Sequence, residues 1–150
     1  MTEQMLLQYT RIVEFLGQAL GPDYEIVLHE ILPEQSRVAA IANGGISGRS
    51  VGAPITNAAL RMIIQKQYEA NDYNINYTGQ LANGKTIRAS TMFIKDGGKL
   101  VGLLCINFDD SRFHEISDSL LRLVHPDDFV HRHYFPSDAP AKQPMQPQHS

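Results

Sequence analysis

Apolar side chains recur along one side of a helical repeat at the start of the chain, which predicts an amphipathic helix over residues 3–20. Gly21 and Pro22 then end this helix. The apolar positions are Met5, Leu6, Tyr9, Ile12, Val13, Leu16, Ala19 and Leu20. Two interpretations stay open on this pattern: a helix packed on its own domain, and a helix that pairs with a second copy of the chain.

Short segments rich in β-branched and aromatic residues predict five strands, at 24–31, 37–43, 75–81, 86–94 and 99–108. Asn83-Gly84 and Gly97-Gly98 separate the last three segments, and both pairs are typical of hairpin turns. The last three strands should therefore form an antiparallel meander. Because the strands are nearly continuous in apolar character, we expect them to be buried on both faces.

Between the second and third strands, the sequence predicts a glycine-rich segment at 44–52 and a helix from Pro54 to about Tyr68. Residues 70–76 are polar and rich in asparagine, which favours a loop. A further helix is expected over 110–124. Two strands, a helical insert and three antiparallel strands indicate an α+β domain with one sheet, whose insert covers one face.

Composition favours a globular domain, since 43% of residues are hydrophobic and 19% are charged. The formal net charge is −3, and the 13 Lys and Arg residues are scattered, so this chain alone is a poor candidate for binding duplex DNA. The single cysteine excludes an intrachain disulfide and favours a reducing compartment. With no apolar run of membrane-spanning length and no signal peptide, we expect a cytoplasmic protein that does not enter membranes.

Four blocks carry a family resemblance. They are DYEIVLHE at 23–30, AIANG at 40–44 running into ISGR at 46–49, VGAPIT at 51–56, and STMFI at 90–94 with LCIN at 104–107. In their order and spacing these blocks resemble the YheO-like PAS domain. The resemblance implies an α+β, PAS-like fold: a five-stranded antiparallel sheet with a helical insert and an N-terminal helix, and a pocket between sheet and insert.

In that family the sensor domain usually precedes a helix-turn-helix module of a bacterial transcription regulator. No helix-turn-helix pattern follows Asn107, so DNA contact is expected only through a module absent from this chain. We expect an N-terminal amphipathic helix at 1–20, a PAS-like sensor domain at 21–110, a C-terminal helical segment at 111–135 and a disordered tail at 136–150.

Polar residues within buried strands are candidates for a binding site, because an unpaired buried polar group costs roughly 1–3 kcal/mol. Any one of them taken alone more often bonds to backbone, but their concentration in one small sheet favours a pocket. Arg88 is a further polar residue of these strands. The candidate ligand-binding residues are His29, Asn43, Ser47, Arg49, Ser90, Thr91, Cys105 and Asn107.

The Ser47-Gly48-Arg49 segment is the sharpest of these candidates. A glycine loop can direct backbone N–H groups at an anion, and an arginine can bind a carboxylate with two hydrogen bonds. The alternative is a tight turn in which Arg49 is paired with a nearby acid, and the sequence favours neither. The loop is not a P-loop, because the lysine and the required spacing are missing.

Enzymatic and metal-binding interpretations have less support. Cys105 with His29 suggests a thiol nucleophile, but a cysteine inside a strand is more often a small buried hydrophobe. His125, His131 and His133 are expected to be solvated rather than metal ligands. No flavin-adduct motif surrounds Cys105, and no cofactor is identified.

The leading hypothesis is therefore a homodimeric, non-enzymatic sensor that binds a small polar metabolite, such as a carboxylate, and signals to a DNA-binding module. The alternative is a ligand-free dimerisation or protein-interaction module. A small enzyme using Cys105 or His29 is a third hypothesis, for which no complete set of catalytic groups is recognisable.

Overall fold

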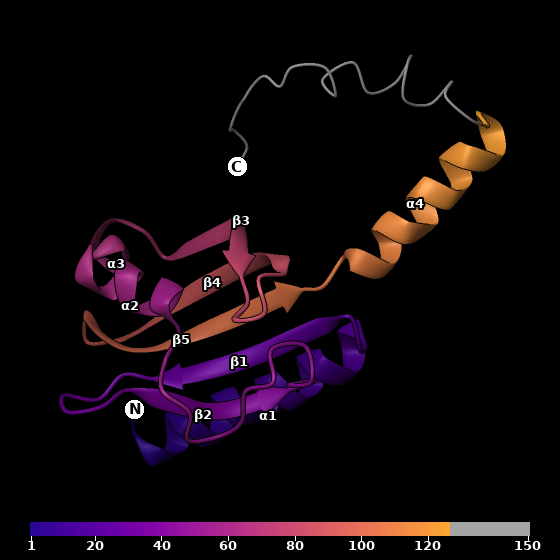
Figure 1. The fold of residues 1–150 in the computed structure, drawn as a ribbon. Coiled ribbons are helices and arrows are strands. Elements are labelled where there is room, and N and C mark those ends of the chain that lie inside the picture. Colours follow the sequence, from indigo (N-terminus) through magenta and orange to yellow (C-terminus); the bar gives the residue numbers. More distant parts are fainter. Residues whose placement is uncertain (127–150) are drawn as a thin grey trace. The chain divides into compact units, whose positions relative to one another are not determined.

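A computed structural model describes residues 1–126, in two units of which the first is Met1–Asp109 and the second begins at Asp110. The first unit is a single five-stranded sheet with three helices (Figure 1). Its elements are α1 (Glu3–Leu20), β1 (Tyr24–Glu30), β2 (Arg37–Ala42), α2 (Asn57–Ile64), α3 (Gln67–Ala70), β3 (Tyr73–Gln80), β4 (Thr86–Asp96) and β5 (Lys99–Phe108).

The strands lie in the order β2-β1-β5-β4-β3, and every neighbouring pair is antiparallel. The predicted five-stranded antiparallel sheet is confirmed, with the helical insert between the second and third strands. The predicted meander of β3, β4 and β5 is also confirmed, and its turns place Gly84, Gly97 and Gly98 at positive φ. Since β1 pairs with β5, the first and last strands form the centre of the sheet.

The apolar stripe of α1 packs against its own sheet. Val13 is fully buried, and Leu6, Ile12 and Leu16 join it in a cluster with side chains of β1, β2, β4 and β5. Figure 1 shows α1 running along β1 and β2. Packing inside the domain therefore accounts for this part of the stripe, whereas Ala19 and Leu20 at its end are exposed. Pairing of the helix with a second copy stays a prediction.

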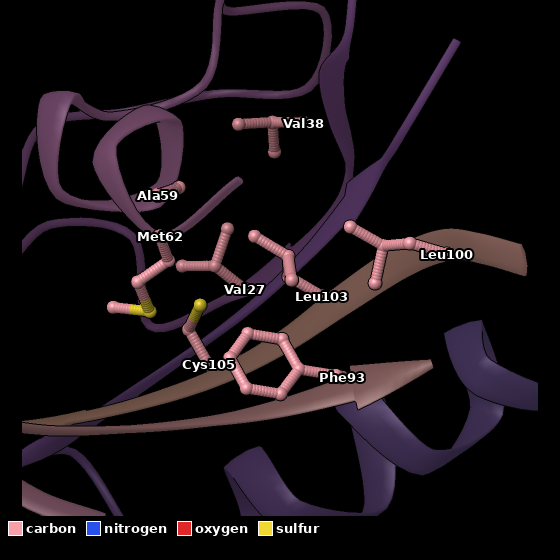
Figure 2. Close-up of a cluster of buried hydrophobic side chains, with 8 residues drawn as sticks. All are labelled: Val27, Val38, Ala59, Met62, Phe93, Leu100, Leu103 and Cys105. Carbon is pink, nitrogen blue, oxygen red and sulfur yellow. The ribbon is translucent and has the colours of Figure 1, made fainter. Parts of the chain in front are cut away.

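The opposite face of the sheet is covered in part by the helical insert. Figure 2 shows Ala59 and Met62 of α2 pointing toward Val27 of β1 and Cys105 of β5. The same cluster includes Phe93 and the fully buried Leu103. The two faces thus have separate cores, one under α1 and one under α2.

The helical insert is shorter than the sequence predicted. Pro54 does not begin the helix, because it forms an isolated β-bridge with Arg37, and Thr56 caps α2 by accepting a hydrogen bond from the Ala59 amide. Lys66 then adopts a left-handed conformation, with φ of 54°, which separates α2 from α3. One predicted helix is therefore two.

Strand β3 begins at Tyr73, within the segment predicted to be a loop. The pairing of β3 with β4 shifts register between Asn74 and Tyr77, and Asn76 within this stretch takes a φ of 56°. This irregularity accommodates the polar residues inside the strand. The prediction that the strands are buried on both faces holds for β1 beyond Tyr24. It is wrong for β3, an edge strand with exposed positions along its length.

In the second unit, α4 (Ser111–Val124) has no buried residue, and the exposed fraction of Leu123 reaches 81%. Phe113, Ile116 and Leu120 are also exposed. The expected helical segment at 111–135 extends past the described residues, and the expected disordered tail at 136–150 lies outside them. Among residues 1–126, no helix combines the length and apolar character that crossing a bilayer requires.

Candidate functional site

A cavity of about 630 Å³ lies between the sheet and the helical insert. Alternate residues of β1, β4 and β5 line it from the sheet, since successive side chains of a strand point to opposite faces. The loop after β2 and the start of α2 line it from the other side. The sequence-predicted residues that line this cavity are His29, Ser47, Arg49, Thr91, Cys105 and Asn107.

Glu25 is a fully buried carboxylate at this cavity. Its Oε2 accepts hydrogen bonds from the backbone N–H and the hydroxyl of Ser47, and its Oε1 accepts one from Asn107 Nδ2 at 3.0 Å. It forms no ion pair with any residue in the described part of the chain. Three neutral donors therefore stabilise a buried negative charge and tie the glycine-rich loop to β1 and β5.

His29 lies on the same face of β1 as Glu25 and is 1% exposed. Burial, together with the nearby charge of Arg49, lowers the pKa of His29 to about 4, so the imidazole is neutral near pH 7. Among the described residues, its Nδ1 is buried and has no hydrogen-bond partner. Because leaving a buried polar atom unpaired is costly, His29 marks this wall of the cavity as a candidate ligand position.

A short chain of hydrogen bonds links three further cavity residues. Tyr77 OH lies 2.7 Å from Thr91 Oγ1, which lies 3.3 Å from Cys105 Sγ. Burial raises the pKa of the Cys105 thiol to about 11, and burial raises that of Tyr77 to about 12. Cys105 is therefore a protonated thiol at neutral pH, which does not suit a nucleophile.

Arg49 is partly buried and lines the cavity. Its Nη1 donates to the Pro54 carbonyl oxygen at 2.7 Å, and within residues 1–126 it has no acidic partner within ion-pair distance. The structure therefore contradicts the alternative in which Arg49 pairs with a nearby acid. The other guanidinium N–H groups remain for a ligand.

Four consecutive backbone amides of the glycine-rich loop have partners within the protein. Those of residues 46, 47, 48 and 49 donate to Asn43 O, Glu25 Oε2, Gly44 O and Ser47 Oγ, respectively. Because the fold uses these four N–H groups, they are not free for a ligand anion, although that of Ser47 does meet a carboxylate, that of Glu25.

Two predicted site residues lie elsewhere. The Asn43 amide donates to the carbonyl oxygens of Gly17, Gly21 and Tyr24, so it joins the end of α1 to β1. Ser90 accepts a hydrogen bond from the Asn76 amide and faces a second, mostly apolar hollow on the other side of the sheet. Neither residue lines the cavity between sheet and insert.

Sequence reasoning missed Glu25, Tyr77 and the first turn of α2, all of which line the cavity. The alternation of β1 could have revealed Glu25, because it lies two strand positions from Val27 and four from His29. Tyr77 was hidden by the irregularity of β3. In residues 1–126, no cluster of His, Cys, Asp and Glu is arranged to hold a metal ion, and His131 and His133 lie outside that part.

Comparison with known proteins agrees with this arrangement. A family model described as the YheO-like PAS domain matches residues 1–125. The protein YheO of Escherichia coli strain K12 is 31% identical over 125 residues, which are 82% of this chain and 52% of the relative. A Haemophilus influenzae protein is 30% identical over 108 residues, 71% of this chain and 48% of the relative. This chain spans about half the length of these curated relatives, and it belongs to the YheO-like PAS domain family.

Proposed function

We propose that this PAS domain binds a small polar metabolite in the cavity between its sheet and its helical insert, and that binding regulates transcription. The supporting observation is His29, which lines a cavity of about 630 Å³ and whose buried Nδ1 has no partner among the described residues. That volume falls within the range of about 300–1,000 Å³ common for small-molecule sites. Arg49 and Asn107 provide further polar groups at the same cavity.

The connection of the cavity to the end of β5 supports a signalling role. Asn107 hydrogen-bonds to Glu25 in the cavity, and the next residue, Phe108, ends β5. The ring of Phe108 lies 4.6 Å from that of Tyr24 and 4.9 Å from the Arg88 guanidinium, so the strand end is firmly held. A ligand that changes the bonding of Asn107 therefore acts within four residues of the start of α4.

We also propose that ligand binding is passed on to a DNA-binding module. The family resemblance implies a helix-turn-helix module that contacts DNA. This chain spans about half the length of the relatives that it matches. We propose that the cytoplasmic domain acts as a homodimer that passes the state of the cavity to such a module. Leu6, Ile12 and Leu16 of α1 are partly buried against the sheet. The apolar side chains that the same helix leaves exposed, and that are available to a dimer, are Leu7, Phe15 and Leu20. Multi-angle light scattering tests the dimer separately from ligand binding.

A thermal-shift screen with a library of polar metabolites tests the binding step. A ligand that binds only the folded state raises the melting temperature, and the rise grows with the logarithm of the ligand concentration once this exceeds Kd. Ala89→Leu fills the cavity with a larger side chain at a position that is 4% exposed, and it should abolish the shift. Ala19→Leu on the exposed side of α1 is the matched control and should keep it. Absence of any stabilising metabolite would contradict the proposal.

A ligand-free interaction module is the second candidate, and the exposed apolar side chains of α4 favour it. On this reading Ala89→Leu leaves partner binding unchanged. The raised pKa of Cys105 argues against thiol catalysis. We therefore propose a binding domain rather than an enzyme.

A further inference from the structure

The first turn of α2 presents unused hydrogen-bond donors to the cavity. Asn57 and Ala58 are the first two residues of the helix, and their backbone N–H groups have no partner among the described residues. The next amide, that of Ala59, is bonded to the Thr56 hydroxyl. Asn57 and Ala58 both line the cavity, so the partially positive end of α2 lies at its wall.

His29 provides an independent sign that a ligand belongs here. Its side chain lines the same cavity, is 1% exposed, and carries an Nδ1 with no partner in the described part of the protein. The fold bonds the other buried polar side chains of this wall, Glu25 and Thr91, to protein groups. A ligand atom on Nδ1 would complete the buried polar side-chain position that residues 1–126 leave open.

The charges at the cavity favour a ligand with one negative charge. Arg49 contributes one positive charge whose guanidinium is only partly used, and the imidazole of His29 is neutral. Glu25 contributes one buried negative charge with no cation within ion-pair distance in residues 1–126. Inorganic phosphate, which is partly a dianion near neutral pH, would meet stronger repulsion from Glu25, whereas a carboxylate matches the single charge of Arg49.

We propose that the ligand is a small monocarboxylate, whose carboxylate is held by the amides of Asn57 and Ala58 and by Arg49, and which also hydrogen-bonds to His29 Nδ1. This inference rests on the proposed function and names the ligand class of the same cavity. The remaining lining mixes apolar residues, such as Val27 and Ala89, with polar ones, such as Thr91, which suits a short body with few polar groups.

The test is a titration of ¹⁵N-labelled protein with four probes: butyrate, 2-hydroxybutyrate, butyramide and inorganic phosphate. Butyramide has the shape of butyrate without its charge. We expect both carboxylates to shift the amide signals of Asn57 and Ala58, and 2-hydroxybutyrate to shift the His29 ring nitrogens as well. Butyramide and phosphate should bind at least about tenfold more weakly.

Three variants make the test specific. Arg49→Gln should weaken carboxylate binding about tenfold or more, whereas Arg11→Gln on the exposed side of α1 should have no effect. Asn57→Pro removes one N–H at the first helical position, where proline is tolerated, and should also weaken binding about tenfold. Asn57→Ala keeps that N–H and should therefore weaken binding less than Asn57→Pro does.

Equal binding of butyrate and butyramide, or carboxylate binding that is unchanged in both Arg49→Gln and Asn57→Pro, would overturn the inference. Absence of carboxylate binding would also overturn it. If uncharged metabolites then stabilise the protein in the thermal-shift screen and Ala89→Leu abolishes the effect, the sensor function stands and only the ligand class is wrong. If no metabolite of any class binds, both proposals fall.

Discussion

Ser47 donates two hydrogen bonds, from its backbone N–H and its hydroxyl, to the same carboxylate oxygen of Glu25. These two residues come from the glycine-rich loop and from β1, so the pair joins the loop to the sheet. Asn107 donates to the other oxygen and adds β5 to the connection. The shape of the cavity wall therefore depends on one buried carboxylate that accepts from three donors.

Replacing Glu25 with glutamine should destabilise the protein by about 1–3 kcal/mol, although the side chain keeps its size. The amide nitrogen would face either the Ser47 donors or the Asn107 amide, and one buried donor would lose its acceptor. Chemical denaturation with circular dichroism measures the change. Glu14→Gln, at an exposed position of α1, is the control and should be neutral within about 0.5 kcal/mol. A Glu25→Gln variant as stable as the parent would show that the network does not hold the loop.

The lowered pKa of His29 predicts a loss of stability in mild acid. The unfolded chain binds a proton below about pH 6.5, while the folded imidazole stays neutral until about pH 4. Between these values the unfolded state holds more protons, so stability falls as pH falls. Between pH 7 and pH 5, His29 should account for a loss of about 2 kcal/mol.

The substitution His29→Gln removes this titration. Between pH 7 and pH 5, the free energy of unfolding of the variant should fall by about 2 kcal/mol less than that of the parent. Denaturant unfolding at pH 7 and pH 5 gives the comparison. His114→Gln, at an exposed position of α4, should lose stability as the parent does. Equal losses in the parent and in His29→Gln would mean that His29 titrates normally in the folded protein.

The thiol of Cys105 should be unreactive in the folded protein, since burial raises its pKa to about 11 and its residue is 7% exposed. Alkylation by iodoacetamide at pH 8 should be at least about 100-fold slower than in denaturant. Because the chain has one cysteine, the mass of the intact protein reports this reaction directly. Labelling at the rate of the unfolded chain would instead agree with the nucleophile hypothesis.

The sequence predicts most of this fold but only part of the site. Strand positions and turns followed from local patterns, and Gly97 and Gly98 form their hairpin as expected. The break at Lys66 and the strand irregularity at Asn76 escaped prediction, because both residues adopt a positive φ. Lysine seldom does so, and asparagine does so more often but only at positions that local sequence does not identify.

The site was harder to predict because it depends on side-chain partners. The sequence placed Asn43 among candidate ligand residues, yet tertiary contacts direct its amide to three backbone carbonyls at the end of α1. Glu25 was not considered, because an acidic residue in a strand is usually on an exposed face. Its burial depends on Ser47 and Asn107, which lie 22 and 82 residues away along the chain.

This chain should not bind duplex DNA by itself. Its formal net charge is −3, and its Lys and Arg residues are spread along the sequence rather than gathered in one arm or helix. Fluorescence anisotropy at low salt is a severe test, because low salt strengthens attraction to phosphate. Micromolar, salt-sensitive binding would reveal a basic surface and would remove the need for a separate DNA-binding module.

Native mass spectrometry tests the central claim, a ligand in the cavity, most directly. The parent protein, incubated with a bacterial metabolite extract and desalted gently, should carry one additional small molecule per chain. Ala89→Leu should lose this adduct, Ala19→Leu should keep it, and denaturation should release it because no covalent bond is formed. A parent protein that appears only at its sequence mass, or an adduct that Ala89→Leu retains in full, would contradict the claim.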